Sequence, residues 1–392
     1  MTTIYIIRHA EAEGNLYRRI HGWYNSLITE NGYRQIAALA ARFRDVPIGA
    51  VYSSDLFRTM TTARAVYETH GLALRTRSDL REISMGAWED RTWGEVSRFD
   101  REQYTRYSHC DPRWKNRGGE SRQEARARIV GAVRDIAARH PGETVAVFSH
   151  GDIIRCLQAE VDGLPVEEML SLGHCDNTGV TGLRAEGERL EILFRNDNSH
   201  LSDEISTLAR QRWWKDQKNA VADANFWFRP LEQGDGALFC ALHRETWTGL
   251  YGAERGYDER AFFRDALERT AQDSHTASVA MLGDRPAGVV ELDLERDREA
   301  GAGHIRFLAL TPEHRKRGLA PQLLGQAVSR FRTMGRDRLR LLCAPENAAA
   351  QRFYARHGFR KIGEQPGHLG PLDQMEKDIS YRERPIHFDE IV

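Results

Sequence analysis

Two short apolar runs, far apart in the sequence, each lead into a histidine, and they constrain the fold of the first half of this chain most strongly. Residues 4–7 are followed by Arg8 and His9, and residues 144–148 are followed, after one serine, by His150. Each run has the length and composition of a buried strand. Ligands of α/β proteins bind at the carboxyl ends of parallel strands. We therefore predict one site that contains both histidines and the arginine.

The segments between these two runs alternate between helical and strand patterns. Apolar residues recur at helical spacing from Thr29 onward and again over 121–139, and a short strand is expected at 48–52. A further helix follows His150. This alternation favours a mostly parallel sheet covered by helices on both faces, which is a three-layer αβα fold.

The residue types at these strand ends suit the transfer of a phosphoryl group. Such a group carries negative charge on its oxygens, and Arg8 and Arg58 can offer guanidinium forks that match its geometry. A neutral imidazole such as that of His9 can act as a nucleophile. A carboxylic acid is needed to protonate the leaving alkoxide, and Glu82 is the best-placed candidate.

Length and composition limit the class of protein. A chain of 392 residues exceeds the usual size of one hydrophobic core, so two domains are expected. A net charge of −1 argues against nucleic acid or a membrane surface as a partner. The five cysteines show no metal-type spacing, and neither a signal peptide nor a long apolar span is evident. We expect a cytoplasmic protein that needs no metal.

A second pattern begins near residue 225 and predicts a mixed-sheet α+β domain. Two helical stretches precede a hairpin of strands at 277–282 and 287–294. A further strand then leads into a basic, glycine-containing loop and an amphipathic helix. Backbone amides at a helix N-terminus form an anion site that suits a pyrophosphate, and Arg315 adds positive charge.

The junction between the two patterns is polar and alanine-rich. We interpret 205–224 as a helical connector whose Trp213-Trp214 pair docks on one of the domains. It has no Pro- or Ser-rich stretch, so the domains are expected to pack together. The predicted division is a first domain at 1–204, the connector, and a second domain at 225–392.

Five ordered motifs in the first half resemble the histidine phosphatase superfamily, in its phosphoglycerate-mutase-like branch. They read IIRHAEAEGN, SSDLFRTMTTA, LREISMGAWED, GGES and VAVFSHGDIIR and cover roughly residues 1–200. The resemblance implies that His9 becomes a phosphohistidine, that Glu82 is the general acid and that His150 also takes part in catalysis. The residues that it implies for phosphate binding are Arg8, Asn15, Arg58 and His150.

The sequence departs from the pattern of this family beside the nucleophile. Ala10 and Ala12 stand where the family usually has Gly and Thr, and neither of those residues carries out the chemistry. Loss of the threonine hydroxyl is expected to lower the rate or to alter the substrate preference. The segment between Glu82 and His150 is short compared with the mutases of the family, which favours a phosphatase.

Two motifs in the second half resemble the GNAT acetyltransferase superfamily over roughly residues 226–380. The run LTPEHRKRGLA matches its acetyl-CoA loop, and ENAAAQRFYARHGF resembles a later motif. The resemblance implies that acetyl-CoA pairs with the strand at 307–310 and that Tyr354 is the general acid toward the departing thiolate. The residues implied for acetyl-CoA are Leu308, Leu310, Arg315, Arg317, Gly318, Ala320 and Asn347. The general base is not identified by these motifs; Glu291, on a neighbouring strand, is one candidate.

Together the two halves predict a bifunctional enzyme, a phosphomonoesterase joined to an N-acetyltransferase. We expect both sites to act on one small aminated, phosphorylated metabolite. Two alternatives stay open: a regulatory phosphoprotein phosphatase fused to an acetyl-CoA-sensing or protein-acetylating module, and a protein in which one half only binds. Aromatic residues after Glu82 are interpreted as a lid over a small-molecule site or as plain core: Trp88, Trp93, Tyr104, Tyr107 and Trp114.

Overall fold

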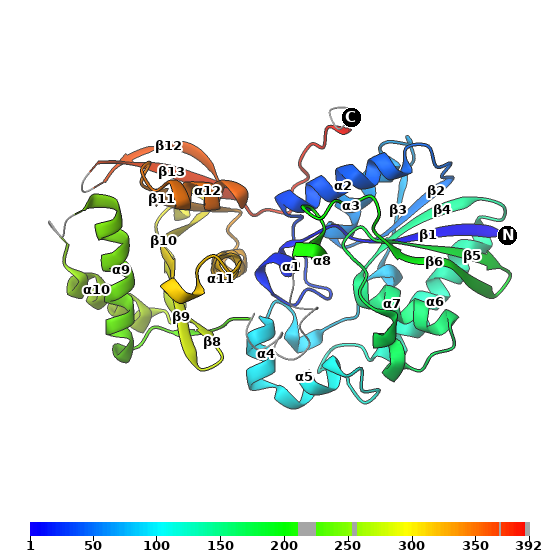
Figure 1. The fold of residues 1–392 in the computed structure, drawn as a ribbon, viewed down its shortest axis with the longest axis horizontal. Coiled ribbons are helices and arrows are strands. Elements are labelled where there is room, and N and C mark those ends of the chain that lie inside the picture. Colours follow the sequence, from blue (N-terminus) through cyan, green and yellow to red (C-terminus); the bar gives the residue numbers. More distant parts are fainter. Residues whose placement is uncertain (211–224, 253–256, 368–369, 389–392) are drawn as a thin grey trace.

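The protein forms two lobes that lie side by side (Figure 1). The computed structural model describes residues 1–210, 225–252, 257–367 and 370–388. The first lobe is built on a six-stranded sheet and the second on a seven-stranded sheet. Within these ranges, none of the helices has the length and apolar character that a membrane span requires.

The sheet of the first lobe is mostly parallel, as the alternating pattern predicts. Its strands are β1 (Thr2–Arg8), β2 (Ala50–Ser54), β3 (Leu74–Arg77), β4 (Thr144–Ser149), β5 (Val180–Glu186) and β6 (Arg189–Asp197). The order is β3-β2-β4-β1-β5-β6, in which the first four strands pair in parallel and β5 pairs antiparallel with both β1 and β6. The parallel strands end at one edge, so the residues that follow β1, β2 and β4 come together there.

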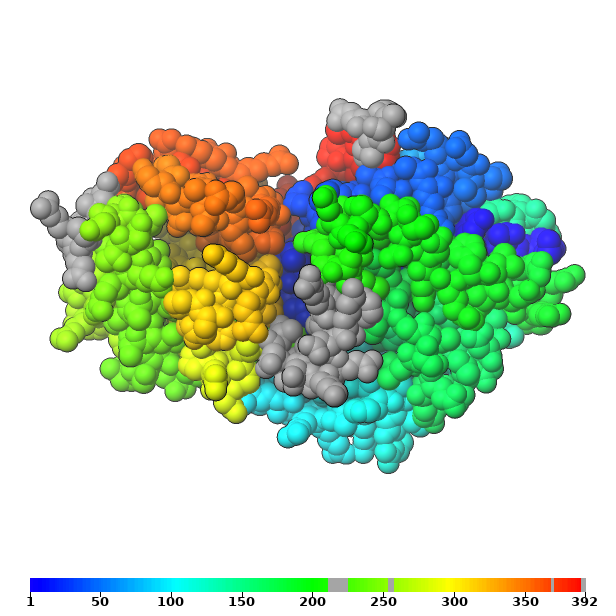
Figure 2. Space-filling model, viewed as in Figure 1, coloured from blue at the N-terminus to red at the C-terminus, as the bar shows by residue number. Residues whose placement is uncertain are grey.

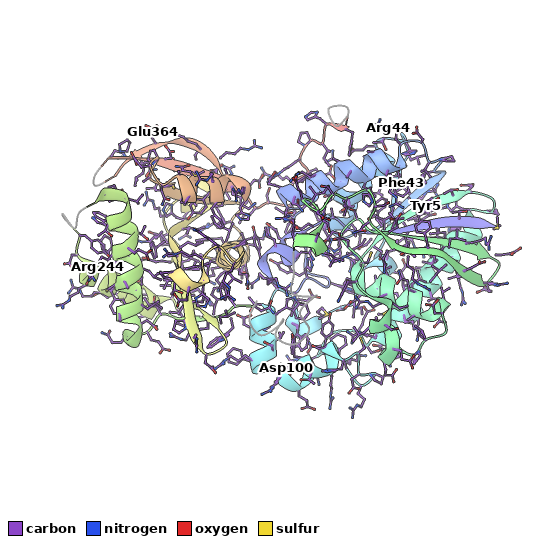
Figure 3. The ribbon with its side chains drawn as sticks, viewed as in Figure 1. Tyr5, Phe43, Arg44, Asp100, Arg244 and Glu364 are labelled. Atoms are coloured by element: carbon purple, nitrogen blue, oxygen red, sulfur yellow. The ribbon has the colours of Figure 1, made fainter. Side chains whose placement is uncertain are left out.

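Helices cover both faces of this sheet and complete the predicted three-layer αβα fold. They are α1 (Glu13–Tyr17), α2 (Glu30–Phe43), α3 (Phe57–Tyr67), α4 (Trp93–Phe99), α5 (Arg101–Ser108), α6 (Arg122–Arg139), α7 (Gly151–Val161) and α8 (Thr207–Arg210). Helices α2 and α3 pack on one face, and α6 and α7 pack on the other. In the α2 layer Tyr5 meets Phe43 edge to face, with ring centroids 5.4 Å apart (Figure 3).

The second lobe has a mixed sheet, in agreement with the predicted α+β class. Its strands are β7 (Trp227–Pro230), β8 (Ala277–Leu282), β9 (Arg285–Asp293), β10 (Ala302–Leu310), β11 (Arg338–Cys343), β12 (Arg360–Pro366) and β13 (Pro371–Asp378). Helices α9 (Gly236–Tyr251) and α10 (Glu259–Gln272) pack on one face; α11 (Ala320–Thr333) and α12 (Ala348–Arg356) pack on the other. In the order β12-β13-β11-β10-β9-β8-β7, only β10 and β11 pair in parallel among the described strands.

Strands β10 and β11 part before β10 ends. Their pairing runs from Ala302 opposite Arg338 to Ile305 opposite Leu341 and stops there. A bulge in β10 between Ile305 and Phe307 lies at the same point. The last part of β10 therefore has a backbone edge that is not paired with β11 and is available to a ligand.

The lobes meet where α1 of the first lobe lies against α11 of the second. Figure 2 shows that the two lobes are in contact. A side chain at Gly325 of α11 would overlap the Tyr17 ring, which shows how closely the two helices approach. The end of the chain returns to the first lobe, where Ile386 and Phe388 pack against its core. The predicted tryptophan pair, Trp213 and Trp214, lies outside the described residues.

The aromatic cluster after Glu82 belongs mainly to the core and not to a lid. Trp88 and Trp114 are each 1% exposed and sit in the core of the first lobe. Tyr107 packs on both rings and donates a hydrogen bond from its hydroxyl to Asp152 at 2.7 Å. These residues therefore form part of the core, and the interpretation as a lid is wrong. The sequence could not separate the two interpretations, because a core and a lid can use the same aromatic residues.

Candidate functional site

Four parallel strand ends bring the predicted phosphate-site residues to one edge of the first sheet. Arg8 ends β1 and His9 follows it, His150 follows β4, and Arg58 lies in the first turn of α3 after β2. Glu82 follows β3 after one short turn. His9 is 2% exposed, and both Arg58 and His150 are fully buried. The structure therefore assembles, in one buried site, residues from four separate parts of the sequence.

His9 is held as a neutral imidazole with one free nitrogen. Its Nδ1 lies 2.7 Å from the carbonyl oxygen of Ala10, and a carbonyl can only accept, so Nδ1 carries the proton. Burial, and then the charges of Arg58 and Arg8, lower the pKa of His9 well below the ordinary value. The lone pair is therefore on Nε2, the atom that a nucleophilic role requires.

Two further histidine rings surround His9. The His150 ring centroid is 5.3 Å away, and the His21 ring meets His9 edge-on at 5.5 Å. His150 contacts the hydroxyl of Ser54 through Nε2 at 3.0 Å. Burial, followed by the positive charge of Arg58, lowers the pKa of both rings well below the usual range. All three imidazoles are therefore neutral at pH 7.

Arg58 is fixed by the loop that follows α1. Its two terminal nitrogens donate to the carbonyl oxygens of His21, Gly22 and Tyr24 at 2.7–3.0 Å. A buried guanidinium that is held in this way keeps its charge in one position. The loop thus determines where the positive charge of Arg58 lies relative to His9.

Three buried nitrogen atoms at this site have no hydrogen-bond partner among the described residues. They are Nε of Arg8, Nε of Arg58 and Nδ1 of His150. Arg8 otherwise donates to the carbonyl of Cys175 at 2.5 Å and lies against Gly151, at the N-terminus of α7. Buried polar groups are almost always paired, so several unpaired nitrogens around one histidine indicate a site for an anion.

Glu82 and Asp152 are neighbouring carboxyl groups in different environments. Both oxygens of Glu82 accept backbone N–H groups of α7, from Asp152 at 3.1 Å and Ile153 at 2.9 Å. Burial, and then the Asp152 carboxylate, nevertheless raise the pKa of Glu82. The pKa of Asp152 is lowered because Arg155 and Arg122 outweigh the opposing effect of burial. Environments that separate two carboxyl pKa values in this way make Glu82 the better suited of the two to donate a proton.

Asn15 and the two alanines shape the turn after the nucleophile. The Asn15 side-chain oxygen accepts the N–H of Ala12 at 3.0 Å at the start of α1. The N–H of Ala10 donates to the Thr62 hydroxyl at 2.9 Å. Both alanines are fully buried. Asn15 thus orders the turn that leads away from His9, and the alanines pack in the core beside it.

A cleft of about 1780 Å³ lies in the second lobe and reaches the first. One wall includes residues of α1 and α2, such as Tyr17 and Arg34. The residues predicted for acetyl-CoA and its general acid all line it: Leu308, Leu310, Arg315, Arg317, Gly318, Ala320, Asn347 and Tyr354. Residues from the two separate acetyltransferase-like motifs therefore line one cleft.

The loop before α11 has the shape of an anion-binding turn. Lys316 and Gly318 have positive φ angles of 60° and 75°. These angles turn the chain just before α11, so that the backbone amides of the turn lie at the N-terminus of the helix. Arg315 is held by α9, because its guanidinium pairs with the Glu245 carboxylate at 2.5 Å and 2.7 Å. The long unpaired edge of β10 and this loop suit an extended ligand that ends in a pyrophosphate.

Asn347 and Tyr354 lie on α12 at the other wall of the cleft. Asn347 is the N-cap of the helix, and its side chain accepts the N–H of Ala350 at 3.1 Å. Tyr354 packs edge-on against Phe359, and burial raises the pKa of its hydroxyl. A phenol with a raised pKa keeps its proton at neutral pH and can donate it to a leaving thiolate.

Several residues of the first site were not predicted from the sequence. His21 and Ser54 contact the predicted histidines, and Arg122 helps to lower the pKa of Asp152. His21 lies in a glycine-containing loop, where one histidine has no periodic or paired signal. A contact with His9 was therefore not visible in the sequence.

Comparisons with known proteins agree with both resemblances. Residues 4–198 match the model of the histidine phosphatase superfamily (branch 1), and residues 237–359 match that of the acetyltransferase (GNAT) family. The chain is 33% identical over 177 residues to a probable phosphoglycerate mutase GpmB of Cronobacter sakazakii, which is 45% of this chain and 82% of that protein.

Two further similarities concern the first lobe. The chain is 29% identical over 203 residues to phosphoserine phosphatase 1 of Hydrogenobacter thermophilus, which is 52% of this chain and 96% of that protein. Among solved structures, YhfR of Bacillus stearothermophilus is 30% identical, with a TM-score of 0.50, and the match covers 52% of this chain and all of that one.

Proposed function

This chain joins a member of the histidine phosphatase superfamily to a member of the GNAT acetyltransferase family, and we propose that it is a bifunctional enzyme with one activity in each lobe. In this proposal residues 1–204 hydrolyse a phosphomonoester through a phosphohistidine at His9. Residues 225–392 transfer the acetyl group of acetyl-CoA to an amine. The segment 205–224 connects the two catalytic domains.

The phosphatase reaction proceeds in two steps. Nε2 of His9 attacks phosphorus, the ester bond breaks, and Glu82 gives its proton to the departing alkoxide. Water then attacks the phosphohistidine, its proton passes to the Glu82 carboxylate, and inorganic phosphate leaves. Arg8, Arg58 and His150 stabilise the negative charge on the phosphoryl oxygens in both steps.

The observation that carries this proposal is the set of unpaired buried nitrogens on Arg8, Arg58 and His150 around a neutral His9. A bound phosphoryl group would give each of these atoms an acceptor. The raised pKa of Glu82 supplies the remaining requirement, a protonated carboxyl beside the same site.

A quench experiment tests the nucleophile. Protein is mixed with phosphoserine carrying a radiolabelled phosphate, denatured in alkali, and examined for label on the chain. We expect label on wild-type protein and none on His9→Ala. An active wild-type enzyme that never becomes labelled, or a His9→Ala variant that keeps its phosphatase rate, would refute the phosphohistidine route.

Acetyl-CoA fits the cleft of the second lobe. The amides before α11 and Arg317 would hold its pyrophosphate, and the free edge of β10 at Leu308 and Leu310 would pair with its extended arm. Acetyl-CoA supplies a thioester whose acetyl group an amine can accept. Tyr354 holds the proton that the departing sulfur needs.

We further propose that both lobes act on one small aminated, phosphorylated metabolite. The cleft of the second lobe is lined in part by the first lobe, so one compound can meet residues of both. One relative of the first lobe is a phosphoserine phosphatase, and phosphoserine carries both an amine and a phosphomonoester. Phosphoserine is therefore the first compound to test.

A further inference from the structure

His243, on α9 of the second lobe, is held between aromatic rings and one carboxylate. Its ring centroid is 3.8 Å from that of Phe307 and 4.3 Å from that of Phe239. Its buried Nε2 lies 3.6 Å from a carboxylate oxygen of Glu291. At this distance the carboxylate acts through its charge, and Nε2 has no hydrogen-bond partner among the described residues. The ring is thus held by stacking and by the neighbouring charge of Glu291.

This histidine lies at the point where β10 and β11 part. Pairing between the strands ends at Ile305, and the bulge that follows leads directly to Phe307, on which His243 stacks. The next residues of β10, among them Leu308 and Leu310, line the cleft. A donor that lies along the free edge of β10 therefore brings its far end to the neighbourhood of the His243 ring.

Charges from three neighbouring elements fix the state of Glu291. Arg269 of α10 and Arg306 of β10 both bind one of its oxygens, and Asp265 of α10 contacts both arginines. Burial alone would raise the pKa of Glu291, but His243 and Arg269 hold it below its usual range. Glu291, the candidate base from the sequence, is therefore a poor proton acceptor. It is well suited to orient an imidazole.

We infer that His243 is the general base of the acetyl transfer and that Glu291 is the residue that positions it. The inference rests on the acetyltransferase activity proposed above. The Glu291 carboxylate faces Nε2, which therefore carries the ring proton, and Nδ1 presents its lone pair to the acceptor amine. A carboxylate that orients an imidazole base is a recurrent arrangement in enzymes.

The proton transfers balance. The amine nitrogen forms a bond to the acetyl carbon, the carbon–sulfur bond breaks, and a proton leaves the amine for Nδ1 of His243. Tyr354 gives a proton to the departing sulfur. After release of the products, the proton on His243 is returned to solvent, and solvent restores the proton of Tyr354.

Kinetics with matched variants test the role of His243. The full-length protein is assayed for thiol release from acetyl-CoA with a mixture of small primary amines that includes phosphoserine. We expect His243→Gln to lower kcat by about 10²–10⁴-fold, and one ionisation of the ascending limb of the pH profile to disappear. His275→Gln changes an exposed histidine of the same lobe and should leave the rate and the profile unchanged.

The kinetic results distinguish a failure of the proposed acetyl transfer from a failure of the role of His243 alone. A wild-type protein that acetylates no amine overturns the acetyl transfer and the inference together. A wild-type protein that is active beside an equally active His243→Gln variant overturns the inference alone. A loss of rate in which the ascending limb of the pH profile keeps every ionisation of the wild type also overturns it, because a purely structural role would give that result.

NMR spectroscopy tests the role of His243 without an activity assay, and therefore also if a variant loses activity by misfolding. Histidine-ring NMR resonances of the labelled protein are recorded, and that of His243 is identified by its absence from His243→Gln. We expect Glu291→Gln to change the position of this resonance, and acetyl-CoA to shift it in the wild-type protein. A resonance indifferent to Glu291→Gln, or one indifferent to acetyl-CoA, would overturn the assignment.

Discussion

The ion pair between Arg332 and Glu13 joins the two lobes at the helices that serve both sites. The guanidinium of Arg332, on α11, binds the Glu13 carboxylate at 2.6 Å and 3.2 Å, and the two side chains are 9% and 5% exposed. Glu13 also accepts the N–H of Leu27, and Arg332 donates to the carbonyl of Ile379. Replacement of Arg332 by Met therefore leaves a buried carboxylate without its ion-pair partner.

The magnitude follows from this burial. Removal of one partner from a buried ion pair costs about 3–5 kcal/mol, because the remaining charge loses its compensation without regaining water. A domain of about 150–250 residues loses about 2–4 °C of melting temperature for each kcal/mol of lost stability. We therefore expect Arg332→Met to lower the Tm by roughly 6–20 °C.

Calorimetry with an exposed control pair provides the test. Arg184 and Glu191 of the first lobe also form a 2.6 Å ion pair, but their side chains are 41% and 43% exposed, so Arg184→Met should leave the Tm almost unchanged. The double variant Glu13→Gln with Arg332→Met should recover part of the loss, since the carboxylate left without its ion-pair partner is then also removed. Equal Tm values for Arg332→Met and Arg184→Met would refute the reasoning.

Three further predictions concern the two active sites. His9→Ala should abolish phosphatase turnover and leave acetyl transfer unchanged, as measured by phosphate and thiol release; a parallel loss of both rates would contradict independent sites. Glu82→Gln should lower the phosphatase kcat by about 10²–10⁴-fold. Because burial raises the pKa of Glu82, the wild-type rate should persist below that pKa and fall as the pH rises through it; a pH-independent rate would exclude Glu82 as the acid. Tyr354→Phe should slow thiol release about 10²–10⁴-fold without affecting the phosphatase, and an unchanged rate would remove Tyr354 from its role.

The strand ends of the first lobe were predictable because local signals coincide there. Apolar runs of strand length precede His9 and His150, and parallel strands end at one edge. The second lobe was predictable for a similar reason. A basic, glycine-containing turn, whose backbone amides can bind an anion, is followed directly by the amphipathic helix α11. Sequence order and residue type were sufficient in both cases.

Contacts between residues distant in the sequence were not predictable. Glu13 and Arg332 are 319 positions apart, and each belongs to a helix in which a charged residue ordinarily faces water. His21 reaches His9 only because the loop after α1 folds back over α3. The burial of Glu291 against His243 likewise depends on the packing of α9 on β9, which a single sequence does not reveal.

Mass spectrometry tests whether one compound is a substrate of both lobes. A library of phosphorylated metabolites that includes phosphoserine is incubated with the protein and acetyl-CoA, beside His9→Ala and Tyr354→Phe. We expect one compound to gain an acetyl group and lose its phosphate, with His9→Ala retaining only the first change and Tyr354→Phe mainly the second. Modification of unrelated compounds by the two lobes, with none changed at both groups, would contradict it.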